Sequence, residues 1–260
     1  MRPDFATFFI NSTAHLQHAY WRHMDPAAFP LKPAEGEIDS YGDAVLFGYR
    51  SMDALLRRFF ALAEADTTII LCSALSQQPF LKREGRGGQH FYRLRDISNF
   101  LQLLDIRPRM VEPVMTHQYR LRFAHGSAAE KALAALRQLK LREETVFGAR
   151  LTGTDIHFGC QIYHRSEGNG EVDGVPGRNE PLYFFDLLYA IDAVKSARHH
   201  PEGVLWLRTG EHAVHNEPVS ILDIAPTIYD LIGVGGEVGR GASLVTHFRS
   251  GGRAEEKRVA

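Results

Sequence analysis

The chain has 260 residues, and its 30 Lys and Arg against 31 Asp and Glu give a formal net charge of −1. This balance argues against a protein whose main task is to neutralise nucleic-acid phosphates or anionic lipid, so no nucleic-acid partner is expected. Hydrophobic residues make up 44% of the chain and aromatic residues 10%, which is enough to bury a sizeable core and argues against intrinsic disorder.

The first hundred residues alternate apolar runs with helical patterns. Residues 5–10 are apolar and aromatic and predict a buried strand, which a helix over 14–24 follows. A longer helix is predicted over 41–65, because its apolar positions recur at helical spacing. The apolar run 69–72 is typical of a parallel strand covered on both faces, and a short helix should occupy 96–104. This strand–helix–strand order predicts an α/β sandwich.

The middle of the chain has a different pattern. Residues 114–123 alternate between apolar and polar side chains, which predicts a half-exposed strand. A helix over 128–139 follows, and two more alternating runs, 145–151 and 156–164, are separated by a hairpin-like turn. We therefore expect an antiparallel α+β insertion over residues 106–179.

The last third returns to longer elements. Residues 168–177 are rich in Gly and charge and predict a mobile loop. Apolar periodicity predicts a helix over 184–197, and residues 204–207 predict a strand that belongs with 5–10 and 69–72. A helix should cover 220–232, and the charged tail 249–260 should be flexible.

Two histidine pairs lie beside predicted strands. His15 and His18 are three residues apart on one helix face, so both could approach a metal ion or a phosphate. The alternative is that they cap, stack on neighbouring rings or face solvent. His199 and His200 precede the strand 204–207, where an imidazole could bind a metal or transfer protons. The alternative is a helix C-terminus that the two imidazoles stabilise.

Two further motifs are weaker. His212 and His215 lie three apart in a loop and form a less specific metal candidate. Gly85-Arg86-Gly87-Gly88 combines glycines with a guanidinium, but it lacks the register of a phosphate-binding loop before a helix. Cys72 and Cys160 suit neither a disulfide framework nor a zinc knuckle, which favours a reducing, cytoplasmic location. No apolar stretch approaches the roughly 20 residues that span a bilayer, and no secretory signal is evident, so no membrane association is expected.

Several segments, in their order, resemble the alkaline phosphatase superfamily and, within it, the type I phosphodiesterase/nucleotide pyrophosphatase-like branch. Residues 4–21 resemble its strand followed by an Asp-x-x-x-His metal motif, and 49–56 the helix after it. Residues 67–73 are similar to the strand before its Ser-Asp-His-Gly motif. Residues 199–203 resemble its later metal-binding histidine, and 219–227 its closing Pro-Thr helix.

The resemblance implies a three-layer α/β/α sandwich of the alkaline-phosphatase-like type, with residues 1–105 and 180–248 forming the core around the insertion 106–179. It also implies a two-metal site with zinc or another divalent metal. Only His18 and His199 match the family's ligands, with His15 and His200 as substitutes.

This sequence departs from the family's metal motifs. Ala14 stands where the family has the Asp of Asp-x-x-x-His, and Ala74 and Leu75 stand where it has the Asp and His of Ser-Asp-His-Gly. The family's first metal-binding Asp and its Thr or Ser nucleophile would precede residue 1. Alanine and leucine offer no lone pairs, so these positions cannot form the second metal site.

Three functions therefore stay open. The first is a phosphodiesterase-like hydrolase that is degenerate and weakly active or inactive, with a small phosphorylated molecule as its partner. The second is a metal-dependent phosphoester hydrolase whose nucleophile and first metal ligand lie on a missing N-terminal segment or a second chain. The third is a new single-metal site built from His15, His18 and either His199 or His200. Whether the chain is an enzyme is left undecided by the residues alone.

Overall fold

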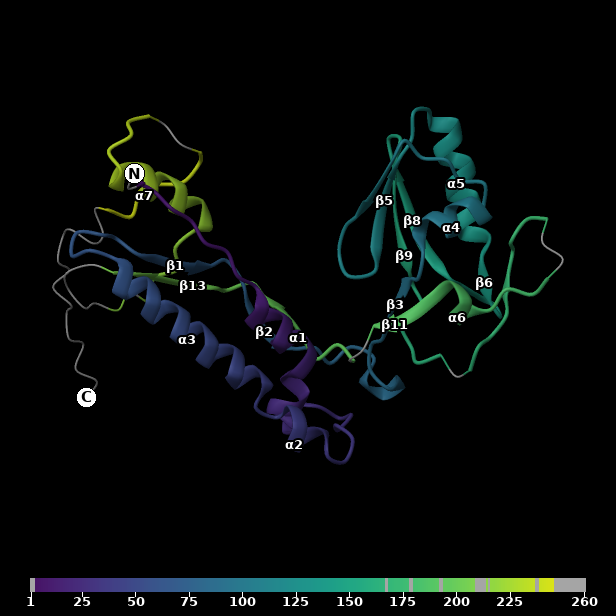
Figure 1. Cartoon of the computed structure of the whole chain (residues 1–260), viewed down its shortest axis with the longest axis horizontal. Coiled ribbons are helices and arrows are strands. Elements are labelled where there is room, and N and C mark those ends of the chain that lie inside the picture. Colours follow the sequence, from purple (N-terminus) through teal and green to yellow (C-terminus); the bar gives the residue numbers. More distant parts are fainter. Residues whose placement is uncertain are drawn as a thin grey trace. The chain divides into compact units, whose positions relative to one another are not determined.

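The structure is a computed structural model, and it describes residues 3–166, 168–177, 180–191, 194–208, 214, 216–236 and 239–245. The chain divides into two compact units (Figure 1). Unit 1 comprises Met1–Ala14, Leu46–Gln78 and His199–Ala260, and unit 2 comprises His15–Val45 and Pro79–Arg198. These bounds differ from the expected core and insertion, so the domain assignment of residues 1–105, 106–179 and 180–248 stays a prediction.

Unit 2 is built on a four-stranded antiparallel sheet. Its order is β4 (Met110–Pro113), β5 (Gln118–Arg122), β9 (Asp155–Cys160) and β8 (Phe147–Thr152). The alternating patterns of 114–123, 145–151 and 156–164 are confirmed as β5 and the hairpin β8–β9. The first of them begins later than expected, because residues 114–117 form the turn that joins β4 to β5.

The two faces of this sheet differ in chemistry, as the period of two requires. Tyr119 and Leu121 of β5 are buried, whereas Arg120 between them points to the other face. There its guanidinium donates to Asp155 of β9, with Nη2 2.5 Å from Oδ2. The hydrogen bond from Arg120 lowers the pKa of the Asp155 carboxyl. Cross-strand ion pairs therefore cover the outer face, and the inner face is apolar.

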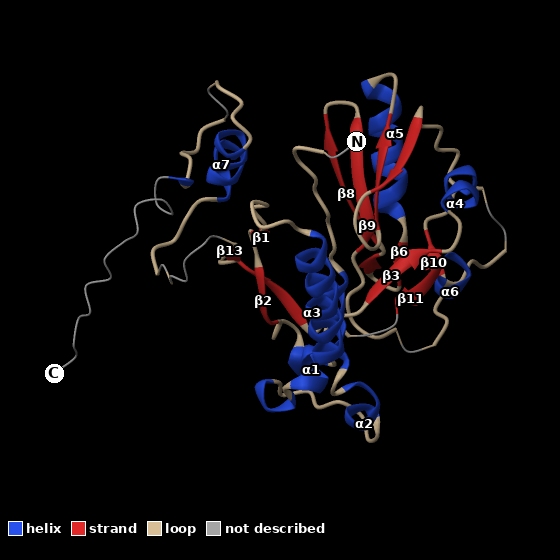
Figure 2. Cartoon of the chain, turned by 60° about the vertical axis from the view of Figure 1, so that its left-hand side comes forward, coloured by secondary structure: helices blue, strands red, loops and turns tan. Residues whose placement is uncertain are grey.

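Two helices enclose the inner face (Figures 1 and 2). Helix α5 (Gly126–Gln138) packs on β8 and β9 through buried Ala129, Ala132 and Leu136. Helix α4 (Ile97–Leu103) begins at Asp96, whose carboxylate accepts hydrogen bonds from the first-turn amides of Ser98 and Asn99 at 2.8 and 3.0 Å. Both helices were expected from the sequence and are confirmed.

The rest of unit 2 consists of shorter elements. They are α1 (Ser12–Met24, which starts in unit 1), η1 (Pro26–Ala28), α2 (Glu37–Tyr41), η2 (Glu84–Arg86), the pair β3 (Phe91–Leu94) and β11 (Leu188–Ile191), the sheet β10 (Val172–Asp173), β6 (Lys140–Leu141) and β7 (Glu144–Thr145), and α6 (Phe184–Leu187). Strand β10 lies within the segment that was expected to be a loop.

The expected helix over 184–197 is wrong. Helix α6 ends at Leu187, and β11 follows it directly and pairs antiparallel with β3, placing Leu188 opposite Leu94. Leu188 is completely buried. The apolar spacing of this segment is compatible with either structure, and pairing with β3 decides for a strand.

Unit 1 contains a two-stranded antiparallel sheet beside a long helix. Strand β1 (Ile70–Ser73) pairs with β13 (Val204–Leu207), and α3 covers Ala44–Leu62. Phe60 of α3 contacts Trp206 of β13, with ring centroids 5.5 Å apart. Turn η3 (Ile221–Asp223) leads into α7 (Ile224–Leu231), and β2 (Ser76–Pro79) pairs with β12 (Ala197–His200) where the division between the units falls.

Two expectations for unit 1 are wrong. Residues 5–10 form no strand, and Phe8 and Phe9 are 61% and 83% exposed. Strands β1 and β13 run antiparallel rather than parallel, and Trp206 is 42% exposed, so this pair is not covered on both faces. An apolar run predicts a tendency to be buried, but it does not specify a partner strand or its direction.

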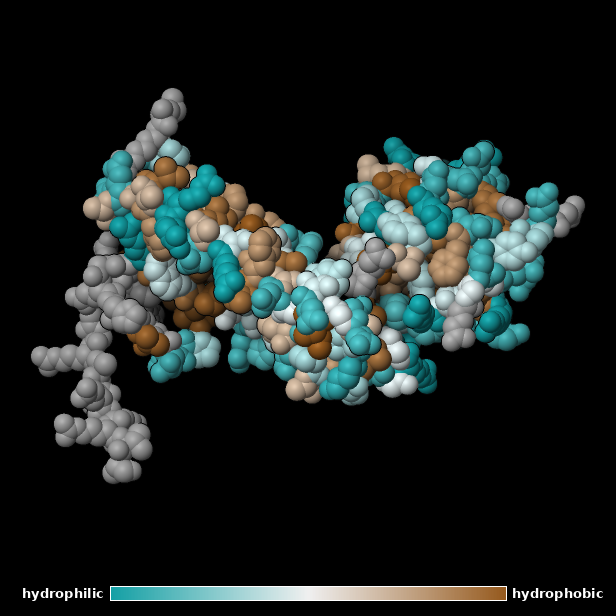
Figure 3. All heavy atoms as spheres, turned by 60° about the horizontal axis from the view of Figure 1, so that its bottom comes forward, coloured by the Kyte–Doolittle hydropathy of each residue, from teal (hydrophilic) through white to brown (hydrophobic). Residues whose placement is uncertain are grey.

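The hydrophobic core lies in unit 2. All members of the buried apolar cluster fall between Tyr92 and Leu188. Unit 1 instead exposes many large apolar side chains, and in Figure 3 hydrophobic residues reach the surface at several places. The chain is thus a mixed α/β protein with several antiparallel sheets. Among the described helices, none has the length and apolar character needed to cross a bilayer. The tail 249–260 lies outside the described residues.

Shortening Leu136 should destabilise unit 2. Its side chain is completely buried between α5 and the sheet, so Leu136→Ala should lower the free energy of unfolding by about 2–5 kcal/mol, measured by urea denaturation. Leu81→Ala is the control, because Leu81 is 52% exposed and its change should be small. Equal losses in the two variants would contradict the position of the core.

Replacing Gly203 should weaken the pairing of β1 with β13. A Cβ at this position would overlap the carbonyl oxygen of Ser73, so Gly203→Ala should cost about 1–3 kcal/mol and reduce the hydrogen-exchange protection of the β1 and β13 amides. Gly235→Ala is the matched control, because a Cβ there has no atom within 4 Å. Unchanged protection in Gly203→Ala would refute the close approach.

Candidate functional site

His18 projects from α1 and is held by the main chain. Its Nδ1 lies 2.7 Å from the carbonyl oxygen of Ala197, and the side chain is half-buried. A carbonyl only accepts, so Nδ1 carries the hydrogen. Histidines that bind metals are commonly oriented by such a hydrogen bond to a carbonyl. The hydrogen bond to Ala197 therefore orients the His18 ring as it would orient the ring of a metal ligand.

A buried ion pair fixes the helix that carries His18. The guanidinium of Arg22 pairs with Glu84, and each side chain is only 5% exposed. The second carboxylate oxygen of Glu84 accepts from the amide of Leu31 at 3.1 Å. The Arg22 amide donates to the Ser196 hydroxyl at 3.1 Å, and the Ser196 amide donates to the His18 carbonyl at 2.7 Å. Burial lowers the pKa of Arg22, against the attraction of Glu84.

His199 lies on β12 and is engaged by two glutamines of β2. Nε2 of Gln77 is 3.1 Å from His199 Nδ1, and Nε2 of Gln78 donates to the His199 carbonyl at 3.1 Å. An amide NH₂ group only donates, so Nδ1 of His199 accepts with its lone pair. In a neutral ring Nε2 then carries the hydrogen. With this hydrogen bond in place, neither nitrogen presents a lone pair to a metal.

The other predicted histidines have separate surroundings. His200 accepts at Nδ1 from the amide of Glu202 at 3.2 Å and so stabilises the turn before β13. His15 is exposed on α1. His18 belongs to unit 2 and His199 to unit 1, so their approach to each other stays a prediction. Within the described part of the chain, no three His, Cys, Asp or Glu side chains are grouped to hold a metal. His212 and His215 lie outside the described residues.

The residues present do not fit the two-metal centre that the resemblance implies. Ala14 is half-buried on α1, and Ala74 and Leu75 are exposed between β1 and β2. None of the three has a donor atom, and Gln77 and Gln78 offer neutral amides where carboxylates would balance the charge of two divalent ions. We derive no catalytic step through such a centre.

The glycine motif at residues 85–88 forms a tight turn. Gly87 and Gly88 have φ of +81° and +83°, which L side chains rarely adopt. A Cβ on Gly88 would also overlap the side chain of Val194. The only helical piece there is the three-residue turn η2, so the motif has a structural explanation and no helix N-terminus for a phosphate.

The same turn contributes to a group of cations that the sequence did not predict. We call it the basic–aromatic cluster, and it lies within unit 2. Its members are Arg83, His117, Lys195, Phe80, Phe91 and Tyr163. The centroids of Phe91 and Tyr163 are 5.9 Å apart in an edge-to-face arrangement, and these two rings are its centre.

Each basic member lies against a ring. The guanidinium carbon of Arg83 is 4.9 Å from the centroid of Tyr163. Lys195 Nζ is 4.7 Å from that of Phe80 and 5.9 Å from that of Phe91. Such cation–π contacts contribute about 0.5–2 kcal/mol each. The His117 ring lies 4.9 Å from Phe91.

Burial works against the positive charge of this cluster. Desolvation lowers the pKa of both Lys195 and His117 and is the sole cause for each. Burial also lowers the pKa of neighbouring His90, and the cationic Arg165 and Arg22 act in the same direction. Among the described residues, no carboxylate raises the pKa of Lys195 or His117.

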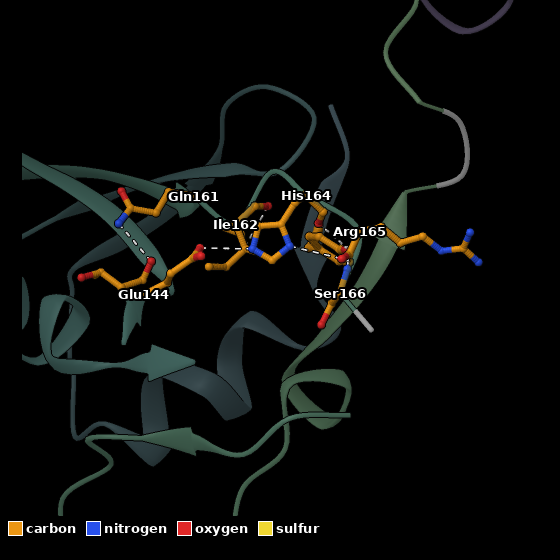
Figure 4. A network of polar contacts seen from close by, with 9 residues as sticks. Glu144, Gln161, Ile162, His164, Arg165 and Ser166 are labelled. Atoms are coloured by element: carbon orange, nitrogen blue, oxygen red, sulfur yellow. Dashed lines mark hydrogen bonds and ion pairs between the residues drawn. The ribbon is translucent and has the colours of Figure 1, made fainter. Parts of the chain in front are cut away.

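Nearby carboxylates already have partners. Glu84 pairs with Arg22, and Glu144 lies 3.2 Å from Nε2 of His164 (Figure 4). The segment that carries Tyr163 and His164 is fixed by Tyr92, whose hydroxyl donates to the His164 carbonyl at 3.0 Å and accepts from the Ser166 amide at 2.8 Å.

The two thiols differ in their surroundings. Cys160 at the end of β9 is buried, and burial raises its pKa to about 12. Cys72 on β1 is exposed, and both cysteines are free.

Sequence reasoning missed the basic–aromatic cluster because its members come from four distant segments. Lys195 fell within the wrongly expected helix, and His117 lies in the turn before β5. The one signal in the sequence is the cationic turn around residues 83–88, whose glycines draw attention to Arg86 rather than to Arg83.

Breaking the Arg22–Glu84 pair should be costly. Arg22→Met leaves a buried carboxylate without its counter-charge, so the free energy of unfolding should fall by about 3–5 kcal/mol, measured by urea denaturation. The double variant Arg22→Met, Glu84→Leu should recover most of the loss. Arg57→Met is the control, because Arg57 pairs with Asp53 at the surface, with 78% and 72% of the two side chains exposed. A double variant no more stable than Arg22→Met would refute this account.

Comparisons with protein-family models, with curated proteins and with solved structures return no match for this chain.

Proposed function

We propose that the chain is a degenerate phosphodiesterase/nucleotide pyrophosphatase-like protein that binds a small phosphorylated molecule and hydrolyses it weakly or not at all. The order of its motifs supports the relationship to the alkaline phosphatase superfamily, and Ala14, Ala74 and Leu75 support the loss of catalysis. The two free cysteines support a cytoplasmic location as part of the same proposal.

The contact between Gln77 and His199 carries this proposal. The amide donates to Nδ1 at 3.1 Å and uses the lone pair that a metal ligand would need. In the family's arrangement, charged ligands would share an ion with this histidine. Here a neutral side-chain amide occupies that place.

A three-layer α/β/α sandwich is the proposed architecture for the family-like core. The contact of α3 with β13 through Phe60 and Trp206 supports one helical layer on one sheet. The remaining strands of that sheet are part of the proposal.

The alternative is a metal-dependent phosphoester hydrolase completed by a further segment or a second chain. Two observations favour it. The hydrogen bond of His18 Nδ1 to the Ala197 carbonyl is of the kind that orients metal-binding histidines. Unit 1 also exposes large apolar side chains around its two-stranded sheet, and such surfaces are commonly covered by another segment.

Turnover measurements decide between the two functions. An aryl phosphate and an aryl phosphodiester are offered to the chain with zinc or manganese, together with His18→Ala and His199→Ala. We expect all three proteins to be indistinguishable, because each lost transition-state stabiliser costs about 10²–10³ in rate and several are missing.

His125→Ala is the control, because His125 is exposed and its side chain does not cap α5. Metal-dependent turnover that either site variant abolishes and His125→Ala retains would overturn the degenerate function and establish the hydrolase.

A further inference from the structure

We propose that Arg83 and Lys195 of the basic–aromatic cluster bind the phosphoryl groups of a small di- or oligophosphate. This inference rests on the proposed function in one respect, the phosphorylated class of the ligand, and it assigns the binding to residues outside the family-like motifs. Both cations belong to unit 2, and the site therefore lies within one compact unit.

Arg83 and Lys195 lack a counter-charge within the described structure. Among the described residues, neither Arg83 nor Lys195 has a salt bridge to a carboxylate, and their defined contacts are with the rings of Tyr163, Phe80 and Phe91. Half-buried cations held over rings lose part of their hydration without gaining an ion pair. A bound anion would supply the missing charge through charge-assisted hydrogen bonds.

A buried imidazole, that of His117, belongs to the same cluster. His117 is only 7% exposed, and its Nδ1 has no hydrogen-bond partner within the described structure. Buried polar atoms nearly always have a partner, so the unpaired Nδ1 of His117 calls for an explanation such as an ion that binds beside it. His117 contacts both central rings, at 4.9 and 6.3 Å between centroids, so its ring will report on an anion that binds at the cluster.

The number of cations selects the ligand. Arg83 lies on Tyr163 and Lys195 on Phe91, and these two rings contact each other, with centroids 5.9 Å apart. A single carboxylate carries one negative charge against two cations. Two linked phosphoryl groups offer several acceptor oxygens and at least two negative charges, which suits one guanidinium fork and one ammonium.

The backbone supports a fixed position for Arg83. This residue has φ of +67°, a conformation uncommon for side chains larger than glycine. Its carbonyl accepts from the amides of Arg86 and Gly88 at 2.9 and 3.0 Å, which closes the turn. The turn that resembles a weak phosphate motif thus presents Arg83 rather than Arg86, from a backbone closed by these two hydrogen bonds.

The test is a titration of the full chain with inorganic pyrophosphate, followed by calorimetry and by the NMR signals of the His117 ring. We expect saturable binding that shifts those signals, and Arg83→Gln and Lys195→Gln should each raise Kd about tenfold, which corresponds to the loss of one charge-assisted contact of about 1.4 kcal/mol. Arg83→Lys retains the charge and should give an intermediate Kd.

Two matched controls test the position of the charge. Arg142→Gln removes an exposed guanidinium from another left-handed backbone position, with φ of +57°, and Lys131→Gln removes an exposed ammonium from α5. Both should leave Kd unchanged. Acetate should not compete.

The proposal is overturned if His117 shows no saturable shift up to about 10 mM pyrophosphate, if the controls weaken binding as much as the cluster variants, or if acetate binds as tightly. The His117 signals of the wild-type chain test pyrophosphate binding even if a variant fails to fold. Turnover of the aryl substrates by the wild-type chain would overturn the proposed function but not the binding of pyrophosphate at this site. A lack of pyrophosphate binding would overturn this site but would not show that the chain is a hydrolase.

Discussion

The structure depends on the burial of one face of a four-stranded antiparallel sheet. Leu121 and Ile156 on that face and Leu136 of α5 are completely buried, and this packing supplies most of the apolar burial in the molecule. The outer face carries ion pairs such as Arg120–Asp155, which contribute little by themselves but keep this face polar. Unit 1 has no comparable cluster among its described residues, so its stability must depend more on specific contacts such as Phe60–Trp206.

Local patterns predicted the parts of the fold whose partners are close in sequence. The hairpin β8–β9 and the helices α4 and α5 follow from alternation, capping and helical spacing within a few residues. The predicted secondary structure is wrong where it depends on a partner strand that is distant in sequence. Leu188 becomes a strand residue because β3 lies opposite it, and the aromatic residues 5–10 stay without a strand partner in the described structure. Neither outcome can be read from the segment alone, because apolar spacing does not specify a neighbour.

Local sequence patterns say even less about the contacts of the candidate site residues. His18 and His199 match the order of the family's motifs, and the structure gives each of them a different local hydrogen bond. A tautomer is set by the group opposite the ring, which here is a carbonyl in one case and an amide in the other. Arg83 and Lys195 carried no motif, since their relation arises only when the turn before β3 and the segment after β11 flank the same pair of rings.

The two thiols lie in different units and differ in their accessibility to reagents. Cys72 is exposed on β1 of unit 1, whereas Cys160 is enclosed in the core of unit 2 with a pKa raised to about 12. Thiolates rather than thiols react with electrophiles and peroxide. At neutral pH, oxidants will therefore react with Cys72 much faster than with Cys160. A maleimide fluorophore can therefore be placed on unit 1 of the native chain without any engineered cysteine, and its emission will report on the surroundings of β1.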